Sequence, residues 1–232
     1  MSRRSSVRRA APRPVVVFDF GGVLSAGHDP VGDVLEITGG DRADVARAYW
    51  DGRAAYDHGD TSPERYWGAV AAAGAIPEPS ATTVEDLQDA DDRYWLRLDP
   101  EARALLHDLA RNGVTLVLLS NASIAFGEAV RRADWFEAFS FAVISGEEGI
   151  VKPDPEIYEI LLSALAHESG GVARPGGVVF FDDREENVRG ARDLGIDAHL
   201  WPRNDPDRDP GTPNPGVAQA RELLAARGIT LD

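Results

Sequence analysis

Short apolar segments alternate with helical patterns along most of the chain, and this rhythm constrains the fold more than any other feature. The apolar segments suited to buried strands are residues 15–18, 114–119, 141–144, 178–181 and, more weakly, 196–201. Helical patterns cover residues 100–111, 124–133, 155–166, 185–194 and 217–227. Strands that alternate with helices predict an α/β fold, in which a Rossmann-like parallel sheet carries helices on both faces.

Residues 28–98 interrupt the rhythm. This segment has no convincing strand and is rich in Ala, Trp and Tyr, with glycines that separate several helical stretches. We therefore expect an all-helical cap, inserted into a core made of residues 15–27 and 99–232. The basic residues 1–14 are expected to form a disordered tail. The insert has seven aromatic residues, Tyr49, Trp50, Tyr56, Tyr66, Trp67, Tyr94 and Trp95. We expect them to build its own core, except that those near residues 56–60 are candidates for a substrate platform.

Composition narrows the classes of partner. The formal net charge of −15 repels a phosphate backbone, which disfavours nucleic acid as a partner. The chain has no cysteine, so any metal must bind to oxygen or imidazole ligands. No stretch approaches the roughly 20 apolar residues that a membrane span needs. We expect a cytoplasmic monomer or homodimer with a small-molecule substrate, bound neither to nucleic acid nor to a membrane.

Polar side chains stand where the predicted strands end. Asp19 follows the first strand, Ser120 with Asn121 follows the second, and Asp182 with Asp183 follows the fourth. Ligands of open parallel sheets bind beyond the carboxyl ends of the strands, so these residues are the candidates for a site. Each also has a plain structural reading as a turn or helix-capping residue.

The acids at the strand ends imply a cation. Three carboxylates at one sheet edge would repel one another in a partly dry site, and a hard divalent ion such as Mg²⁺ removes that repulsion. An aspartate such as Asp19 can attack phosphorus and form an aspartyl phosphate. Ser120 and the backbone N–H groups after it offer a seat for phosphate at a helix start. Lys152 precedes a turn that opens a helix, a place that also suits an ordinary surface lysine.

Taken together and in this order, four segments resemble the motifs of the haloacid dehalogenase-like hydrolase superfamily. They are "FDFGGVL", "LLSNAS", "GIVKPDPEIY" and "VVFFDDREENVRGARDLGI". The helical insert between the first two matches the position of that family's first-type (C1) cap. "YDHGDTSPERYW" resembles the cap segment of its sugar-phosphate phosphatases, such as the glucose-1-phosphate phosphatases.

The resemblance implies a role for each motif residue. Asp19 would be the nucleophile, while Ser120, Asn121 and Lys152 would hold the phosphoryl oxygens. Asp183 would ligate Mg²⁺.

Three further residues would complete the metal site by the same resemblance. The backbone carbonyl of Gly21 would join Asp19 as a metal ligand. Asp182 would support the ion directly or through water, and Asn187 would orient the acidic pair.

Gly21 departs from the family pattern. Most phosphatases of the superfamily carry a second aspartate there, which acts as general acid and base, and its side chain is absent here. Gly21 and Gly22 instead let the backbone turn sharply and approach a phosphate closely. His58 and Asp60, in the cap segment, and then His28 are candidates to replace the missing acid.

The expected function is Mg²⁺-dependent hydrolysis of a small phosphorylated metabolite, with a sugar phosphate favoured, through an aspartyl-phosphate intermediate. Loss of one general acid or base costs about 10²- to 10⁴-fold in rate, which a phosphatase can survive. A phosphate-binding or regulatory protein that has lost turnover is the first alternative. A haloacid dehalogenase is the second, and the paired acids speak against it because that chemistry gains little from a cation.

Overall fold

A five-stranded parallel sheet forms the centre of the molecule. The computed structural model describes residues 14–26, 29–169, 173–202, 212–229 and 231. The strand order is β3-β2-β1-β4-β5, which confirms the predicted parallel sheet. The strands are β1 (Val15–Phe18), β2 (Thr115–Ser120), β3 (Phe141–Ile144), β4 (Val178–Asp182) and β5 (Asp197–Leu200). Because β1 lies in the middle, the residue that follows it is flanked by the ends of β2 and β4.

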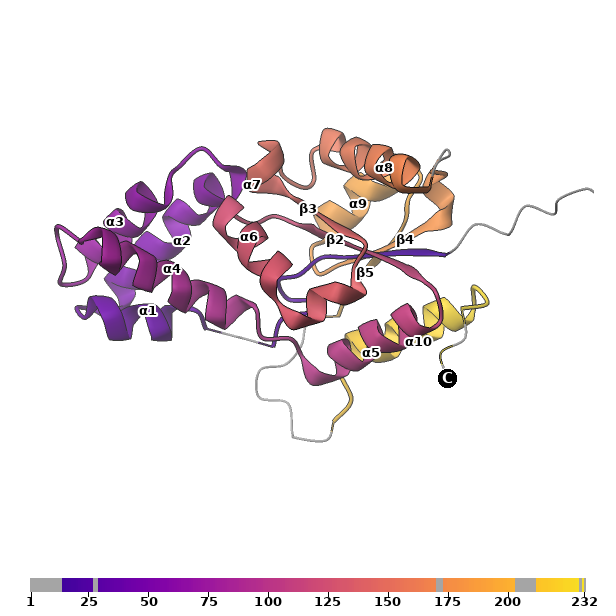
Figure 1. Ribbon diagram of the computed structural model, residues 1–232, viewed down its shortest axis with the longest axis horizontal. Coiled ribbons are helices and arrows are strands. Elements are labelled where there is room, and N and C mark those ends of the chain that lie inside the picture. Colours follow the sequence, from indigo (N-terminus) through magenta and orange to yellow (C-terminus); the bar gives the residue numbers. More distant parts are fainter. Residues whose placement is uncertain (1–13, 27–28, 170–172, 203–211, 230, 232) are drawn as a thin grey trace, which may run out of the picture.

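Helices cover both faces of the sheet (Figure 1). Successive side chains of a strand point to opposite faces, so Val16 and Phe18 join one core and Val17 joins the other. The first core is covered by α5 (Pro100–Arg111), α6 (Ile124–Arg132) and α10 (Pro215–Ala225). The second is covered by α8 (Pro155–Ser169) and α9 (Glu185–Asp193). The chain is therefore a three-layer α/β structure at this end.

The predicted helices form, α5 with the predicted ends and the others with small shifts at theirs. Asp99 accepts hydrogen bonds from the backbone of Glu101 and Ala102, and with Pro100 in the first turn it fixes the start of α5. One short helix had no sequence signal, α7 (Ser145–Glu148), directly after β3. Two short 3₁₀ helices are also present, Asp134–Ala138 and Pro175–Gly177.

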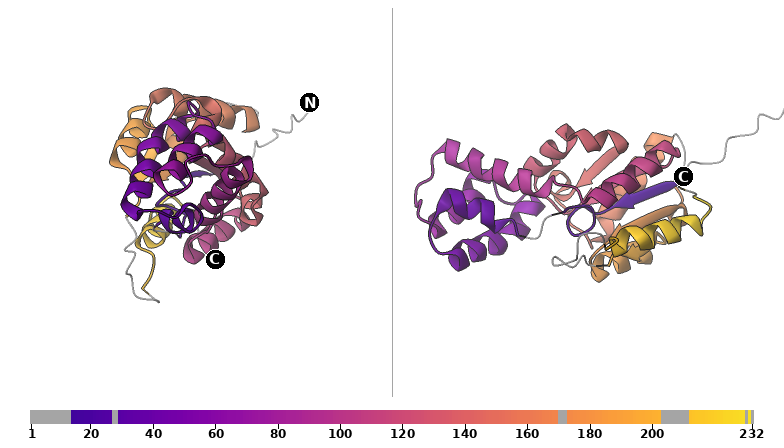
Figure 2. Two further views of the ribbon diagram at one scale, coloured as in Figure 1. Left: turned by 90° about the vertical axis from the view of Figure 1, so that its left-hand side faces the viewer. Right: turned by 90° about the horizontal axis from the view of Figure 1, so that it is seen from below.

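Four helices form a separate bundle beyond the carboxyl ends of the strands (Figures 1 and 2). They are α1 (Val31–Thr38), α2 (Arg42–His58), α3 (Pro63–Ala73) and α4 (Ala81–Trp95), referred to here as the helical module. Tyr49, Tyr66 and Trp67 pack in its centre as expected. Tyr56, a candidate for a substrate platform, is buried in the same core, so that interpretation is wrong for it. The expectation is wrong for Trp50, whose surface is 50% exposed, because it lies on the outer side of α2.

The two segments that join the module to the sheet pair with each other. Ser25 and Leu98 form an antiparallel bridge. The Ala26 N–H donates to the carbonyl of Arg97 at 2.7 Å, and the Asp99 N–H donates to that of Leu24 at 2.8 Å. The two connections between the sheet and the helical module therefore run side by side at this point.

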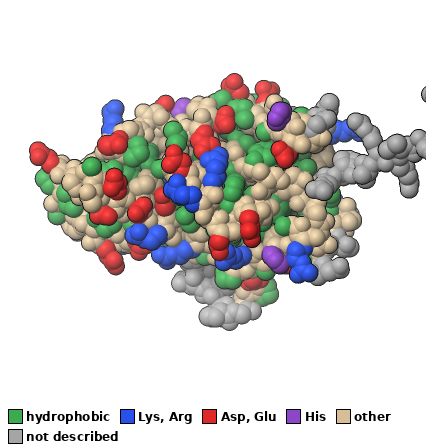
Figure 3. Space-filling model, viewed as in Figure 1, with side chains coloured by type: hydrophobic (Ala, Val, Ile, Leu, Met, Phe, Trp, Pro, Cys, Tyr) green, Lys and Arg blue, Asp and Glu red, His purple; other side chains and the backbone are tan. Residues whose placement is uncertain are grey.

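The described residues contain no helix with the length and apolar content that a membrane span requires. Figure 3 shows acidic and basic side chains interspersed over one face of the molecule. The predicted tail lies outside the described residues apart from Pro14.

Candidate active site

The carboxyl ends of the three central strands bring the sequence candidates together. Asp19 continues β1, and its N–H donates to the carbonyl of Phe181 in β4 at 2.9 Å. Ser120 is the last residue of β2 and Asp182 the last of β4. All three of these polar side chains are buried. The sheet register thus places a hydroxyl and two carboxylates at one edge, facing the helical module.

Lys152 is the positive centre of this site. Its ammonium nitrogen Nζ lies 2.7 Å from Oδ1 of Asp19 and 2.7 Å from Oδ2 of Asp182. It also donates to the carbonyl of Leu119 at 2.8 Å. Burial lowers the pKa of Lys152, but the carboxylates of Asp182 and Asp19 outweigh that effect and raise it. The buried lysine is therefore charged. The alternative interpretation, an ordinary surface lysine, is wrong.

The side chain of Asn121 fixes the backbone that carries this lysine. Its Nδ2 donates to the Lys152 carbonyl at 2.9 Å, and its Oδ1 accepts from the Lys152 N–H at 2.8 Å. Both ends of the amide are thus used to hold the Lys152 backbone, and the second Nδ2 hydrogen and the backbone N–H of Asn121 remain as donors for a phosphate. The segment after β2 and the segment before α8 are joined through this pair.

Asp182 is fully engaged within the protein. Its Oδ1 accepts from the Arg184 N–H at 2.9 Å, and Asn187 donates to both of its oxygens, at 2.9 and 3.1 Å. Together with the bond from Lys152, these contacts leave its carboxylate little capacity for a metal ion. The Tyr158 hydroxyl donates to the Asn187 carbonyl at 2.8 Å and anchors the start of α9. The geometry makes Asp182 the residue that orients Lys152.

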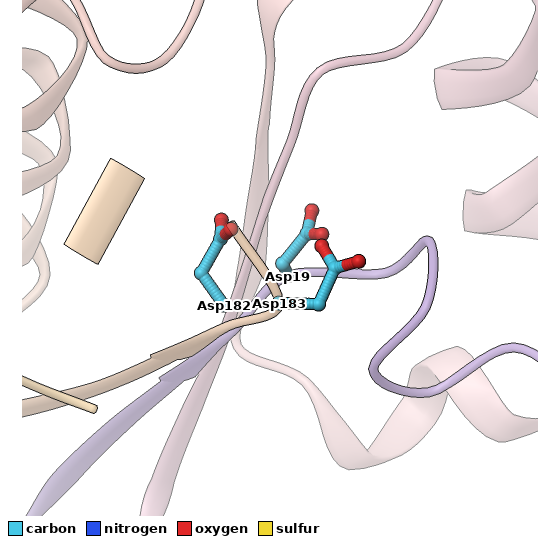
Figure 4. A group of neighbouring side chains, drawn as sticks. All are labelled: Asp19, Asp182 and Asp183. Atoms are coloured by element: carbon cyan, nitrogen blue, oxygen red, sulfur yellow. The ribbon is translucent and has the colours of Figure 1, made fainter. Parts of the chain in front are cut away.

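The side chains of Asp19 and Asp183 lie beside each other, with Asp182 on the other side of Asp19 (Figure 4). Ligand oxygens of all three acids lie within 4.8 Å of one another. This all-oxygen donor set fits a hard divalent cation such as Mg²⁺. A Cβ at residue 22 would meet Oδ2 of Asp183 at 2.7 Å, so Gly22 leaves the space that this carboxylate needs.

The electrostatics of the cluster also fit a cation. Burial raises the pKa of Asp19 to about 7, Lys152 opposes the rise, and Asp182 and Asp183 add to it. A divalent ion beside these carboxylates would add positive charge and keep Asp19 ionised at neutral pH.

Gly21 faces the helical module. A Cβ built on it would lie 3.7 Å from Cζ3 of Trp95, an ordinary contact distance. The Trp95 indole N–H donates to the Tyr49 hydroxyl and to Oδ1 of Asp91, each at 3.0 Å. Trp95 was expected in the module core, and the structure instead packs its ring against the core of the sheet, beside Gly21.

His58 and Asp60 stand at the end of α2. His58 Nδ1 lies 3.1 Å from Oδ2 of Asp60, and the Asp60 side chain is 69% exposed. No hydrogen bond between either side chain and the Asp19–Lys152 centre is present in the described part of the chain. His28 lies outside the described residues.

Sequence reasoning missed a buried ion network in the module. The Arg53 guanidinium donates to Asp57 at 2.8 Å and to Asp91 at 2.9 Å, and also to the Tyr49 hydroxyl. The spacing of four residues between Arg53 and Asp57 on one helix was a weak signal. Asp91 is 38 residues away from Arg53 in the sequence, so its part could not be recognised from the chain alone.

An aspartate–lysine–aspartate centre at the carboxyl ends of a parallel sheet defines an α/β protein with an acidic active site. A family model described as haloacid dehalogenase-like hydrolase matches residues 14–195. The chain therefore belongs to the haloacid dehalogenase-like hydrolase family, which confirms the family that the sequence motifs indicate.

A phosphatase is among its relatives. The chain is 34% identical over 163 residues to a phosphoserine phosphatase of Thermus thermophilus, a match that covers 69% of this chain and 63% of that one. The match thus spans somewhat less than two thirds of the relative's length.

Solved structures share the fold. A family enzyme of Bacteroides thetaiotaomicron, described as a complex with magnesium and inorganic phosphate, superposes with a TM-score of 0.62 at 19% identity, over 84% of this chain and 96% of that one. The L-2-haloacid dehalogenase of Xanthobacter autotrophicus gives a TM-score of 0.60 at 21% identity, over 92% and 83%. At these identities the likeness concerns the fold.

Proposed function

We propose that this protein is a Mg²⁺-dependent phosphatase that acts on a small phosphorylated metabolite. The observation that carries the proposal is the ion pair between Lys152 and Asp19 at the end of the central strand. A carboxylate is a poor nucleophile toward an anionic phosphate unless positive charge lies beside both groups. Lys152 supplies that charge, and the phosphatase among the relatives points to the same chemistry.

In the proposed reaction a carboxylate oxygen of Asp19 attacks phosphorus, and the bond from phosphorus to the leaving alcohol breaks. Ser120 and the backbone N–H groups after it hold the phosphoryl oxygens. Water then attacks the aspartyl phosphate, which releases inorganic phosphate and restores Asp19. Asp182 keeps Lys152 in place throughout, because it binds the same ammonium group.

Asp19, Asp183 and the backbone carbonyl of Gly21 would hold the magnesium ion, and Asp182 would support it from behind. When bound, the ion neutralises charge on the phosphoryl group and on the surrounding acids. The donor set of this chain supports the assignment, and a structural neighbour is described as binding magnesium with phosphate.

The helical module is proposed to act as a cap that covers the substrate and excludes water. Its position beyond the strand ends supports this role (Figure 2). We propose a sugar phosphate as the substrate, on the resemblance of residues 56–67 to sugar-phosphate phosphatases. Phosphoserine, the substrate in the relative's name, is the first competitor. The cytoplasmic location and the monomeric or dimeric state stay predictions.

The test is phosphate release from phosphorylated sugars, phosphoserine and nucleotides, with Mg²⁺ or with chelator, by the wild type and by Asp19→Asn. We expect metal-dependent release that the variant abolishes. Binding of phosphate without turnover across the panel would favour the regulatory alternative, for which Gly21 is the supporting observation. Chloride release from a haloacid in chelator would favour the dehalogenase.

A further inference from the structure

A proton donor for the leaving group is missing from the strand-end cluster. Hydrolysis of an alkyl phosphate needs an acid at the departing oxygen, and residue 21 has no side chain to supply it. Lys152 has three N–H donors, and Asp19, Asp182 and the Leu119 carbonyl engage all three. The carboxylate of Asp182 is fully engaged as well. Asp19 is the proposed nucleophile and Asp183 a proposed metal ligand, so we consider an acid from outside this cluster.

The end of α2 approaches the phosphate-binding loop closely. The Ser145 hydroxyl donates to the carbonyl of Asp57 at 2.5 Å and accepts from the N–H of Ala122 at 2.9 Å. Ala122 is two residues beyond Ser120, in the loop proposed to hold phosphate. A Cβ at residue 59, where φ is +92°, would meet the carbonyl oxygen of Gly146 at 2.7 Å, so the approach requires glycine there.

A second chain of contacts leads from Asp57 to residue 21. Arg53 binds Asp57, and its guanidinium carbon lies 5.7 Å from the centre of the Trp95 ring. That ring in turn covers Gly21. Asp57 is thus linked through Ser145 to the loop after Ser120, and through Arg53 and the Trp95 ring to residue 21.

The carboxyl group of Asp57 suits proton transfer. Its side chain is 16% exposed, and Oδ1 accepts from Nε of Arg53 at 2.8 Å. Burial raises its pKa to about 6, Arg53 opposes the rise, and Asp91 adds to it. A carboxyl group that titrates near neutral pH can serve as acid in one step and as base in the next.

We propose that Asp57 is the general acid and base of this active site, supplied by the helical module in place of residue 21. The inference rests on the proposed phosphatase function. Protonated Asp57 gives its proton to the leaving alkoxide as the bond from phosphorus to oxygen breaks. Ionised Asp57 then takes a proton from the water that attacks the aspartyl phosphate, so the residue ends the cycle as it began.

The decisive test compares two substrates in Asp57→Asn. An alkyl phosphate has a basic leaving group that needs a proton, whereas p-nitrophenyl phosphate releases a stable anion that needs none. We expect kcat/KM for the alkyl phosphate to fall by about 10²- to 10⁴-fold. The aryl phosphate should lose less than tenfold at the first chemical step, measured as the burst of p-nitrophenol. An asparagine can still accept the bond from Arg53, which keeps the module intact.

Asp51→Asn is the matched control, because Asp51 lies exposed on the same helix. It should leave both rates unchanged. Equal losses on both substrates, or no loss on either, in Asp57→Asn would overturn the role of Asp57 while the proposed function stands. Absence of release from both substrates in the wild type would instead overturn the proposed function.

A rescue experiment tests the same assignment from the other side. An aspartate side chain can begin at residue 21, since its Cβ would contact only Trp95 at 3.7 Å. Gly21→Asp placed in the Asp57→Asn background should raise kcat/KM for the alkyl phosphate at least tenfold above that of Asp57→Asn alone. The contrary result is a double variant that folds and still gives the burst of p-nitrophenol, yet hydrolyses the alkyl phosphate as slowly as Asp57→Asn. That result would contradict the idea that one acid replaces the other.

Discussion

The carboxylate of Asp183 occupies the space that a side chain on residue 22 would need. Its Oδ2 lies 2.7 Å from the Cβ position of that residue, whose φ is +74°. A glycine at 22 is thus required twice, once by the left-handed backbone and once by the acid beside it. The second glycine of "FDFGGVL" is therefore part of the acidic site as well as of the turn.

Gly22→Ala should damage both the fold and the site, and its neighbour provides the comparison. A left-handed alanine costs about 1–2 kcal/mol, and the contact with Asp183 adds to this. We expect a lower free energy of unfolding and weaker Mg²⁺ binding, measured by denaturant titration and calorimetry. Gly21→Ala should be near neutral in stability, because its Cβ meets only Trp95 at 3.7 Å. Equal effects of the two variants would contradict this difference.

Magnesium should distinguish the two adjacent acids. A ligand that binds only the folded state raises Tm, so Mg²⁺ should stabilise the wild type by several degrees at saturation. Asp183→Asn should abolish that shift. Asp182→Asn should keep most of it, because the Asp182 carboxylate is engaged by Lys152, Asn187 and the Arg184 N–H. The reverse pattern would make Asp182 the direct ligand.

Removal of the buried lysine should be costly. Lys152→Met would leave the carboxylates of Asp19 and Asp182 without their shared partner, at about 3–5 kcal/mol. The double variant Lys152→Met with Asp182→Asn removes one of those charges and should recover part of the loss. Urea unfolding in chelator measures both. A double variant less stable than the single one would argue that the pair is not the cause.

The sheet and its acidic edge could be predicted because residues close together in the sequence determine them. Apolar runs of four to six residues place the strands, and the polar residue after each run falls at the same edge in any parallel sheet. The predicted helix at residues 100–111 matches α5 at both ends, since Asp99 and Pro100 mark its start. Asp19, Ser120 and Asp182 follow from this logic.

The rest of the site depends on contacts between distant residues. The bonds of Asn121 to the Lys152 backbone join positions 31 apart, and the Ser145 bond to Asp57 joins positions 88 apart. In the sequence, Trp95 is an aromatic residue of a helical stretch, like the core aromatics of the module. Only the packing shows that it covers Gly21. Asp57 was not a candidate from the sequence, because its contacts with Ser145 and Arg53 appear only in the folded structure.

The pH dependence of stability should reveal the proton on Asp57. Its folded pKa of about 6 exceeds its ordinary value of 3.8, so the folded state holds more protons between these two values. The free energy of unfolding contributed by this group therefore falls as pH rises from about 4 to about 6, and it is constant outside that window. Arg53, Asp91 and the Ser123 backbone set this pKa together with burial, and none is altered in Asp57→Asn.

The measurable quantity is the difference in free energy of unfolding between the wild type and Asp57→Asn. This difference, wild type minus variant, should fall by on the order of 2 kcal/mol as the pH rises from 4 to 6, because the asparagine cannot titrate. Asp51→Asn, which replaces an exposed aspartate on the same helix, is measured alongside as the comparison. A flat difference for Asp57 would mean that its carboxyl group is already ionised at pH 4, and it would then lack the proton that the leaving group requires.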